Sequence, residues 1–336
     1  MSMHIIPFHN EWLSQAGELL ARRHRSDRAA LPELPCRFEA PEVARAAIEA
    51  ALKRKHASGF AALDGGRLVA YLIGDLLIDE VWGRSAWVRT PGCAYDPDDG
   101  VEIVRDLYAA LGARWVSHGI FSHFVLVPIT DPSLIHVWFS LSFGIEQIHA
   151  LIDLETLNPA IPAIPPEIEI RKAGPGDRQH LADLSDVIWR HQVKAPVWGI
   201  QMPEAIQEIR EGWAELVDET GVTVWLAFQA GKVVASQGYW PAEPLDDNLL
   251  IPEKSVRLSV AGTREEARGK GINTLLTKYG LAHARSSGYR CCETDWRSTN
   301  LLAARFWPRQ GFRPVAYRLV RRIDPRIAWA NGTTLE

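Results

Sequence analysis

The stretch SVRLSVAGTREEARGKGINTLLTKYGLAHARSSGY, residues 255–289, decides the fold. Apolar residues alternate over 256–260, which predicts a strand. Over 272–279 they recur three and four positions apart, which predicts a helix with one apolar face. The six residues Arg268-Gly269-Lys270-Gly271-Ile272-Asn273 join the two elements. The stretch therefore reads as strand, glycine-rich loop and helix.

The loop at 268–273 has the chemistry of an anion site. The start of a helix presents unpaired backbone N–H groups and the positive end of the helix dipole. Gly269 and Gly271 let the backbone approach a phosphate closely, and Arg268 and Lys270 add positive charge. An ordinary glycine-capped surface turn explains the same residues, so the loop alone leaves both interpretations open.

Composition sets the broad class of the protein. A chain of 336 residues with 47% hydrophobic and 23% charged residues is typical of a globular protein of two domains. A net charge of −4 does not favour a nucleic-acid or membrane partner, and no apolar run reaches transmembrane length. The N-terminus lacks the pattern of a secretory signal, and the four cysteines lack metal-binding spacing. We expect a cytoplasmic protein with reduced thiols and no metal.

The chain repeats one order of predicted elements. The first copy has helices at 11–25, 41–55 and 101–117, a hairpin at 60–74, strands at 86–89, 124–129 and 145–154, and a short helix at 134–141. The second has helices at 177–189 and 203–218, a hairpin at 224–239, the unit at 255–289, a strand at 290–296, a short helix at 300–307 and a strand at 314–323. The proline-rich segment 157–167 reads as a semi-rigid linker. The predicted domains are therefore 1–156 and 168–330.

Matching residues support a duplication. Asp131, Trp138 and Phe143 fall on Asn300, Trp307 and Phe312 with the same spacings, and the hairpin 62–70 falls on 227–235. The copies differ at the loop, since the first has Pro97-Asp98-Asp99 where the second has Arg268-Gly269-Lys270. Carboxylates repel a phosphate and proline removes a donor. We expect the first copy to have lost its anion site.

A second motif makes the loop more specific. Residues 300–307 read Asn-Leu-Leu-Ala-Ala-Arg-Phe-Trp and are followed by Gly311-Phe312. With the loop, this region resembles the GNAT acyltransferase superfamily, whose hallmarks are a Gln/Arg-x-x-Gly-x-Gly/Ala loop and an Asn-x-x-Ala-x-x-Phe-Tyr helix before Gly-Phe. The whole chain resembles a tandem GNAT protein. The resemblance implies an α/β (α+β) fold of two GNAT-like domains, each a mixed, mostly antiparallel twisted sheet with a splayed central parallel strand pair flanked by helices.

The resemblance also implies a donor site for acetyl-CoA or another acyl-CoA. The pyrophosphate would bind the backbone amides of Gly269, Lys270, Gly271, Ile272 and Asn273, with Arg268 ordering the loop. The backbone amide of Thr263 would polarise the thioester carbonyl, and Asn300 would touch the pantetheine. Two residues depart from the pattern. Asn273 stands where glycine or alanine is usual, and its side chain would either donate a hydrogen bond to the phosphate or crowd it. Trp307 replaces the tyrosine that often serves as general acid, and core packing is the favoured role of Trp307.

Residues for the base and the acceptor are less specified. Glu293 and Asp295 lie on one face of the predicted strand at 290–296, Tyr239 ends the hairpin, and His191 is a further candidate. Each is a candidate acid or base, and each has a structural alternative. Trp189, His191 and Trp198 precede the hairpin, where the resemblance implies an acceptor wall, although packing between domains explains aromatic residues there equally well.

These features favour an N-acyltransferase of the GNAT family. It would move an acetyl or acyl group from acetyl-CoA to a primary amine by direct attack in the C-terminal domain. A non-catalytic acyl-CoA-binding or scaffold protein of the same fold is the alternative. An aminoacyl-tRNA donor is disfavoured by the acidic net charge. The sequence does not tell whether the acceptor is a small-molecule amine or a peptide. It also does not tell whether the protein is a homodimer.

Overall fold

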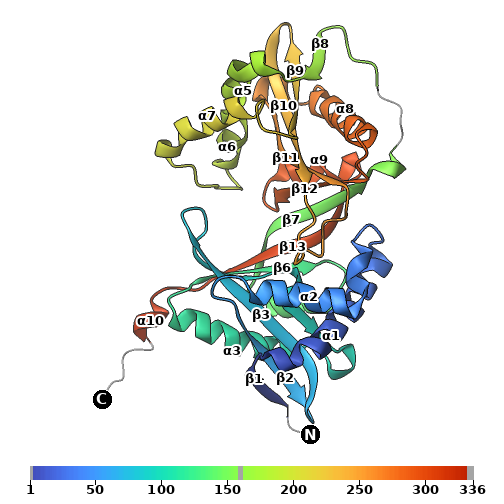
Figure 1. Ribbon diagram of the computed structural model, residues 1–336. Coiled ribbons are helices and arrows are strands. Elements are labelled where there is room, and N and C mark those ends of the chain that lie inside the picture. Colours follow the sequence, from blue (N-terminus) through green and yellow to red (C-terminus); the bar gives the residue numbers. More distant parts are fainter. Residues whose placement is uncertain (1–2, 158–161, 331–336) are drawn as a thin grey trace. The chain divides into compact units, whose positions relative to one another are not determined.

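The computed structural model describes residues 3–157 and 162–330 and divides into two compact units (Figure 1). Unit 1 contains the described chain up to Ile148, together with Pro244–Pro252 and the segment from Pro314 onward. Unit 2 contains His149–Glu243 and Glu253–Arg313. The two units therefore interleave along the chain. Of the linker predicted at 157–167, residues 158–161 lie outside the described residues.

Unit 1 is built on a mixed sheet in the order β1-β2-β3-β4-β6-β13, with β5 paired to β3. Its β4 and β6 run parallel, and its other pairs are antiparallel. The elements are β1 (His4–Pro7), η1 (Asn10–Trp12), α1 (Leu13–Ala30), η2 (Cys36–Glu39), α2 (Pro41–Leu52), β2 (Ser58–Asp64), β3 (Arg67–Asp79), β4 (Gly83–Val88), η3 (Thr90–Gly92), β5 (Cys93–Tyr95), η4 (Pro97–Asp99), α3 (Ile103–Ser117), β6 (Ser122–Pro128), α4 (Pro132–Ser140), β13 (Arg313–Arg322) and α10 (Ile327–Ala330). The strand β7 (Gly144–Asp153) begins in unit 1 and ends in unit 2.

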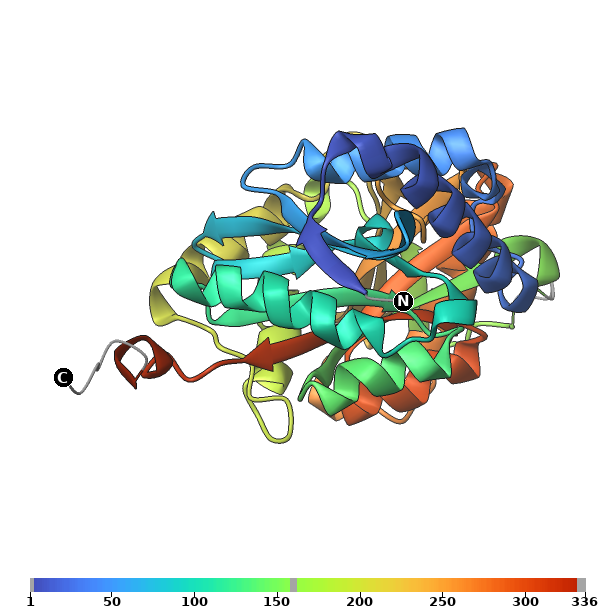
Figure 2. The same cartoon turned by 90° about the horizontal axis from the view of Figure 1, so that it is seen from below.

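Alternation along the strands gives the sheet of unit 1 two buried faces. Ala70 and Leu72 of β3 belong to the apolar cluster that also contains buried residues of α3 and α4. Tyr71 and Ile73 belong to the cluster that contains α1 and α2. Figure 2 shows the blue helices α1 and α2 on one side of these strands and the teal helix α3 on the other. The sheet is thus a central layer between helices.

Unit 2 has the same layered design on a sheet in the order β12-β11-β10-β9-β8. Leu226 and Phe228 pack with residues of α5 and α6, whereas Ala227 packs with residues of α8. The elements are η5 (Leu154–Thr156), β8 (Ile168–Lys172), η6 (Pro175–Asp177), α5 (Arg178–Leu184), α6 (Asp186–Gln192), η7 (Pro203–Ala205), α7 (Ile206–Glu215), β9 (Thr223–Gln229), β10 (Lys232–Ala242), β11 (Ser255–Thr263), η8 (Glu265–Ala267), α8 (Ile272–Ser286), β12 (Cys291–Arg297), α9 (Leu301–Phe306) and η9 (Pro308–Gln310).

One predicted helix is interrupted. The sequence predicts a helix over 177–189, but α5 ends at Leu184 and α6 begins at Asp186. The hydroxyl of Ser185 donates to the carbonyl of Ala182 at 2.7 Å. A serine that bonds back to its own helix competes with the main-chain ladder and favours a break.

The splayed parallel pair is confirmed in unit 2. Hydrogen-bonded pairing of β11 with β12 runs from Ser255 opposite Cys291 to Arg257 opposite Glu293. Both strands continue beyond these residues without pairing to each other. A bulge follows at once in β11, because Val260 lies opposite Gly238 of β10 while Leu258 lies opposite Tyr239. The gap opens toward the end of β11.

The duplication is visible in matching contacts. Asp131 accepts from the N–H of Leu134 at the start of α4, and Asn300 accepts from the N–H of Ala303 at the start of α9. The Trp138 and Phe143 rings lie edge to face with centroids 5.1 Å apart. Their counterparts, the Trp307 and Phe312 rings, lie edge to face at 5.4 Å. The predicted tandem fold is therefore confirmed in detail.

The last strand completes the sheet of unit 1 rather than that of unit 2. The sequence predicts a strand over 314–323 at the end of the second copy, within the domain 168–330. In the structure β13 pairs with β6, with Leu319 opposite Val125, and Leu319 is fully buried in the cluster shared with α3. The segment Pro244–Pro252 likewise belongs to unit 1, where Leu249 is buried among residues of α1 and α2.

We therefore expect Leu319→Ala to destabilise unit 1 although the residue is only seventeen positions from the end of the sequence. Deleting a fully buried leucine side chain costs about 2–5 kcal/mol. Urea denaturation followed by circular dichroism measures the loss. Ile78→Ala, at a side chain that is 53% exposed, serves as the control and should change the free energy of unfolding by less than about 0.5 kcal/mol. Equal effects of the two substitutions would contradict the burial of β13.

Candidate functional site

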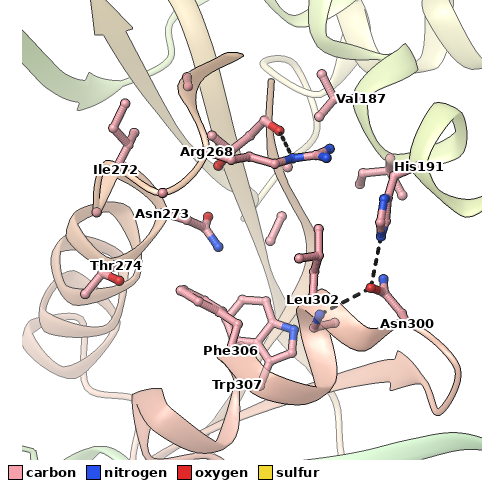
Figure 3. Close-up of a pocket in the computed structure, with 18 of the residues that line it drawn as sticks. Val187, His191, Arg268, Ile272, Asn273, Thr274, Asn300, Leu302, Phe306 and Trp307 are labelled. Atoms are coloured by element: carbon pink, nitrogen blue, oxygen red, sulfur yellow. Dashed lines mark hydrogen bonds between the residues drawn. The ribbon is translucent and has the colours of Figure 1, made fainter. Parts of the chain in front are cut away.

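A cavity of about 460 Å³ lies in unit 2 where the splayed strands open (Figure 3). Four elements supply its walls: the end of β11, the loop into α8, the helix α6 and the helix α9. The lining residues are Val187, Ile188, His191, Gln192, Ala261, Gly262, Thr263, Ala267, Arg268, Gly269, Gly271, Ile272, Asn273, Thr274, Asn300, Leu302, Ala303, Phe306 and Trp307. The motif at 268–273 and the motif at 300–307 thus meet at one cavity.

The end of β11 offers backbone donors to the gap. The N–H of Arg264 donates to Val234 of β10 at 2.8 Å, so by alternation the backbone groups of Ala261 and Thr263 face away from β10. They face the side where β12 no longer pairs. The carbonyl of Thr263 accepts from Arg268 Nε at 3.1 Å, which ties the loop to the strand end.

The glycine loop exposes a run of amides. Gly269 and Gly271 have φ of +77°, a left-handed conformation that glycine adopts without strain. The N–H of Leu275 makes the first helical bond of α8, to the carbonyl of Gly271 at 3.0 Å. Among the described residues, none accepts a hydrogen bond from the backbone N–H groups of 269–274. Their donors and the helix dipole make this end of the cavity suited to an anion.

A hydrogen bond joins the opposite walls. His191 of α6 and Asn300 at the start of α9 meet through Nε2 and Oδ1 at 3.1 Å (Figure 3). Asn300 Oδ1 also accepts from the N–H of Ala303 at 3.2 Å, which fixes it as the amide oxygen. His191 Nε2 is therefore the donor, and in the neutral ring Nδ1 keeps its lone pair.

The cavity has a positive end and an apolar remainder. Arg268 contributes a cation, and the lining residues given above include no carboxylate. Val187, Ile188, Leu302 and Phe306 supply apolar surface. Such a cavity can hold a molecule with an anionic end and a long neutral arm.

Most of the predicted donor-site residues meet at this cavity. Thr263, Arg268, Gly269, Gly271, Ile272, Asn273 and Asn300 line it, as does His191 from the predicted acceptor wall. Lys270 is exposed and donates from Nζ to Gln229 Oε1 at 3.2 Å. Trp189 and Trp198 are not among the lining residues, and the Trp198 side chain is 72% exposed.

Three of the four candidate acid or base residues, Glu293, Asp295 and Tyr239, lie outside the cavity lining. Burial raises the pKa of Glu293, although its ion pair with Arg257 opposes the shift. Asp295 is exposed on the same strand. Tyr239 is buried, its hydroxyl donates to Gln237 Oε1 at 2.7 Å, and burial raises its pKa well above the usual range. None of the three contacts the cavity in this structure.

Trp307 lines the cavity as part of an aromatic cluster. It is 6% exposed and lies edge to face with Phe306, with centroids 4.8 Å apart, and with Phe312. Its counterpart Trp138 in unit 1 is fully buried against Phe143. The shared geometry indicates that tryptophan fills the same space in both copies.

Several wall residues were missed in the sequence. On α6, Val187, Ile188 and Gln192 line the cavity together with His191, and on α9 Leu302, Ala303 and Phe306 do so together with Trp307. Each set follows the spacing i, i+1, i+4, i+5, which identifies one face of a helix. That spacing is a signal in the sequence, but it does not tell a cavity wall from a core face.

In unit 1 the loop matching 268–273 is closed by ion pairs. Asp96 pairs with Arg22 and with Arg67, each at 2.9 Å, and Asp99 pairs with Arg67 at 2.7 Å. The Tyr95 hydroxyl donates to Asp131 Oδ2 at 2.6 Å. Ion pairs between the aspartates and Arg22 or Arg67 therefore cover the loop in unit 1, whereas the matching loop in unit 2 presents backbone amides without a partner among the described residues.

The described part of the chain gives no sign of a metal centre or a membrane span. No group of three or more His, Cys, Asp or Glu side chains within 3–157 and 162–330 has the arrangement of a metal site. No helix in those ranges is both long and apolar enough to cross a bilayer. None of the four cysteines, all within those ranges, forms a disulfide.

Comparison with known proteins identifies the domain around the cavity. The family model for the acetyltransferase (GNAT) family matches residues 183–312. No curated protein matches the sequence.

Three solved structures share the fold. One is a tandem GNAT protein from the clavulanic acid biosynthesis pathway, at 18% identity and a TM-score of 0.51 over 96% of this chain and 98% of that chain. A GCN5-related N-acetyltransferase from Sphaerobacter thermophilus matches at 16% identity and 0.56, over 95% of each chain. The glucosamine N-acetyltransferase region of a fungal multi-domain GH3 β-N-acetylglucosaminidase matches at 17% and 0.56, over 95% of this chain and 38% of that chain. The predicted fold class is confirmed.

The shared capping geometry leads to a stability prediction. Asn300→Ala should lower the free energy of unfolding by about 1 kcal/mol because α9 loses its N-terminal cap. Asp131→Ala should lower it by about the same amount in unit 1, since Asp131 caps α4 in the same way. Asn300→Asp keeps a capping oxygen and is the matched control, measured by urea denaturation. Equal losses for Asn300→Ala and Asn300→Asp would contradict the capping role.

Proposed function

Because residues 183–312 form a GNAT acetyltransferase domain, we propose that the chain is an N-acyltransferase whose cavity in unit 2 binds acyl-CoA and passes the acyl group to a primary amine. The observation that carries the proposal is the run of unpartnered amides at 269–274, beside Arg268, at one end of a largely apolar cavity. The amides suit the pyrophosphate of CoA, and the cavity suits the pantetheine arm. Acetyl-CoA is the donor that we expect.

In the proposed reaction the amine nitrogen attacks the thioester carbon directly. A carbon–nitrogen bond forms, the carbon–sulfur bond breaks, and CoA leaves as a thiolate. The N–H of Thr263, which faces the gap beside β11, donates to the carbonyl oxygen as negative charge develops there. Asn300 contacts the pantetheine from the start of α9.

His191 is the residue that we assign to the acceptor side. Among the lining residues, only His191 and Arg268 have titratable side chains. The bond of His191 to Asn300 leaves the Nδ1 lone pair to accept the amine proton, which can then pass to the CoA thiolate. Glu293, Asp295 and Tyr239 have no part in this scheme because they lie outside the lining. Trp189 and the exposed Trp198 remain our proposal for the outer acceptor wall.

The first copy has no donor site in this proposal. Its loop pairs Asp96 and Asp99 with Arg22 and Arg67, so the ion pairs and Pro97 replace the free amides that a pyrophosphate needs. We therefore expect one acyl-CoA per chain.

A non-catalytic acyl-CoA-binding protein is the second candidate. It is favoured by Trp307, because an indole packed against Phe306 and Phe312 is a poor acid for a leaving thiolate. The two candidates share the donor site and differ in whether thiol is released.

Calorimetric titration with acetyl-CoA tests the donor site. We expect one molecule bound per chain, and Gly271→Glu should lower the affinity about 100-fold or more because it puts a carboxylate at the amides. Gly100→Glu is the matched control, since Gly100 occupies the equivalent position in unit 1, with φ of +86° and no heavy atom within 4 Å of an added Cβ. Two molecules per chain, or loss of binding in Gly100→Glu, would contradict the assignment.

Thiol release with a panel of small amines and peptides then separates the two candidates. Release that depends on one class of amine supports an acyltransferase and identifies the acceptor. Tight binding with no release across the panel would favour the acyl-CoA-binding protein.

His191→Gln tests the acceptor side. Glutamine retains a donor for Asn300 but cannot take up a proton, so we expect kcat to fall about 100-fold or more while the Kd for acetyl-CoA stays unchanged. An unchanged kcat would remove His191 from the reaction.

A further inference from the structure

A buried chain of hydrogen bonds lies behind the glycine loop. The Tyr239 hydroxyl donates to Gln237 Oε1 at 2.7 Å. Gln237 Nε2 donates to Asn273 Oδ1 at 2.9 Å and to Thr277 Oγ1 at 2.8 Å. Gln237 is fully buried, and Tyr239 is 3% exposed. Gln237 and Tyr239 are therefore shielded from water, and their hydrogen bonds connect β10 to Asn273, the second residue of α8.

The donor and the acceptor of each of these hydrogen bonds can be assigned. The Thr277 hydroxyl donates its proton to the carbonyl oxygen of Asn273 at 2.8 Å. Because the hydroxyl has no second proton, Thr277 Oγ1 must accept from Gln237. The nitrogen of the Gln237 amide consequently points at α8, and its oxygen points at Tyr239. Asn273 Oδ1 is then the acceptor, and Asn273 Nδ2 is left as the free end of that side chain.

The free end of Asn273 belongs to the cavity. Asn273 is among the lining residues, and its side chain points into the cavity in Figure 3. None of the described residues accepts a hydrogen bond from Asn273 Nδ2. The buried hydrogen bonds thus orient Asn273 so that its Nδ2 donor, rather than its Oδ1 acceptor, faces the cavity beside the glycine loop.

Close packing against α8 keeps Tyr239 and its hydrogen bonds in position. A Cβ added at Gly280 of α8 would lie 2.3 Å from the Tyr239 hydroxyl oxygen. Glycine at this position lets the Tyr239 ring pass directly against α8. Burial also keeps Tyr239 protonated, because it raises the pKa well above the usual range.

We propose that Asn273 donates from Nδ2 to a pyrophosphate oxygen of bound acyl-CoA, and that Gln237 and Tyr239 are positioning residues that set its orientation. The inference rests on the proposed function and deepens its donor site. It makes Asn273 a hydrogen-bond donor rather than a side chain that crowds the phosphate. It also gives Tyr239 a role in binding instead of proton transfer.

The sign of the change in affinity tests the donor role. If Asn273 donates, Asn273→Ala should weaken acetyl-CoA binding about tenfold, as expected for a lost hydrogen bond to a charged group. If Asn273 crowds the site, the same substitution should tighten binding. Equal or tighter binding by Asn273→Ala, measured by calorimetry, would overturn the proposal.

Asn273→Asp tests the identity of the partner. A carboxylate of the same shape repels a pyrophosphate, so Asn273→Asp should weaken binding at least tenfold more than Asn273→Ala. Beside a neutral amide of pantetheine the two variants would bind alike, and that result would overturn the assignment to the pyrophosphate.

A double-mutant cycle tests the positioning role. Tyr239→Phe removes the hydrogen bond that Gln237 Oε1 accepts, so the glutamine holds Asn273 less firmly, and acetyl-CoA binding should weaken about threefold to fivefold. The same substitution in the Asn273→Ala background should have no further effect. A loss of the same size in both backgrounds would mean that Tyr239 acts only through general stability.

Two controls keep the outcomes separate. Tyr279 lies on α8, like Asn273, but outside the cavity lining, so Tyr279→Phe should leave the affinity for acetyl-CoA unchanged. Thermal denaturation of each variant checks that it is folded. If the unsubstituted protein fails to bind acetyl-CoA, the proposed function fails. If it binds and Asn273→Ala binds as well or better, this inference alone fails.

Discussion

The site depends on one interruption in the sheet, the point at which β11 and β12 stop pairing. Their ladder ends at Arg257 opposite Glu293, and the Thr294 hydroxyl satisfies the carbonyl of Leu258 just beyond it. A pair that continued to the strand ends would use the backbone groups of Thr263 within the sheet. Because the pair opens early, those groups face a cavity instead, and the glycine loop that follows is brought to its edge.

Two copies of one design have kept the same scaffold and diverged at one loop. The caps supplied by Asp131 and Asn300 have the same geometry, and the tryptophan–phenylalanine pairs differ by only a few tenths of an ångström in centroid distance. At the loop, unit 1 satisfies its polar groups internally through Asp96 and its arginines, whereas unit 2 leaves its amides open. Internal neutralisation stabilises a fold, but it removes the donors that a ligand would need.

The sequence predicted those features that local pattern controls. Periodicity and glycine chemistry were enough for the unit at 255–289, and the spacing within 300–307 was enough for α9 and its cap. The pairing of β13 with β6 was not predictable, because alternation shows which faces of a strand are apolar and not which sheet edge it joins. The orientation of Asn273 depends on Gln237, thirty-six positions away, and such a bond follows only from the folded packing of α8 on β10.

The interleaving of the units bears on how the protein is made. Unit 1 stays incomplete until Pro244–Pro252 and β13 have been translated, although most of its residues are translated first. Its sheet is therefore completed last, by contacts of very long sequence separation, which folding reaches slowly. The N-terminal copy cannot be excised as an independent module by a simple cut in the gene. That dependence gives a structural reason why the first copy, whose loop is closed by ion pairs, is retained beside the second.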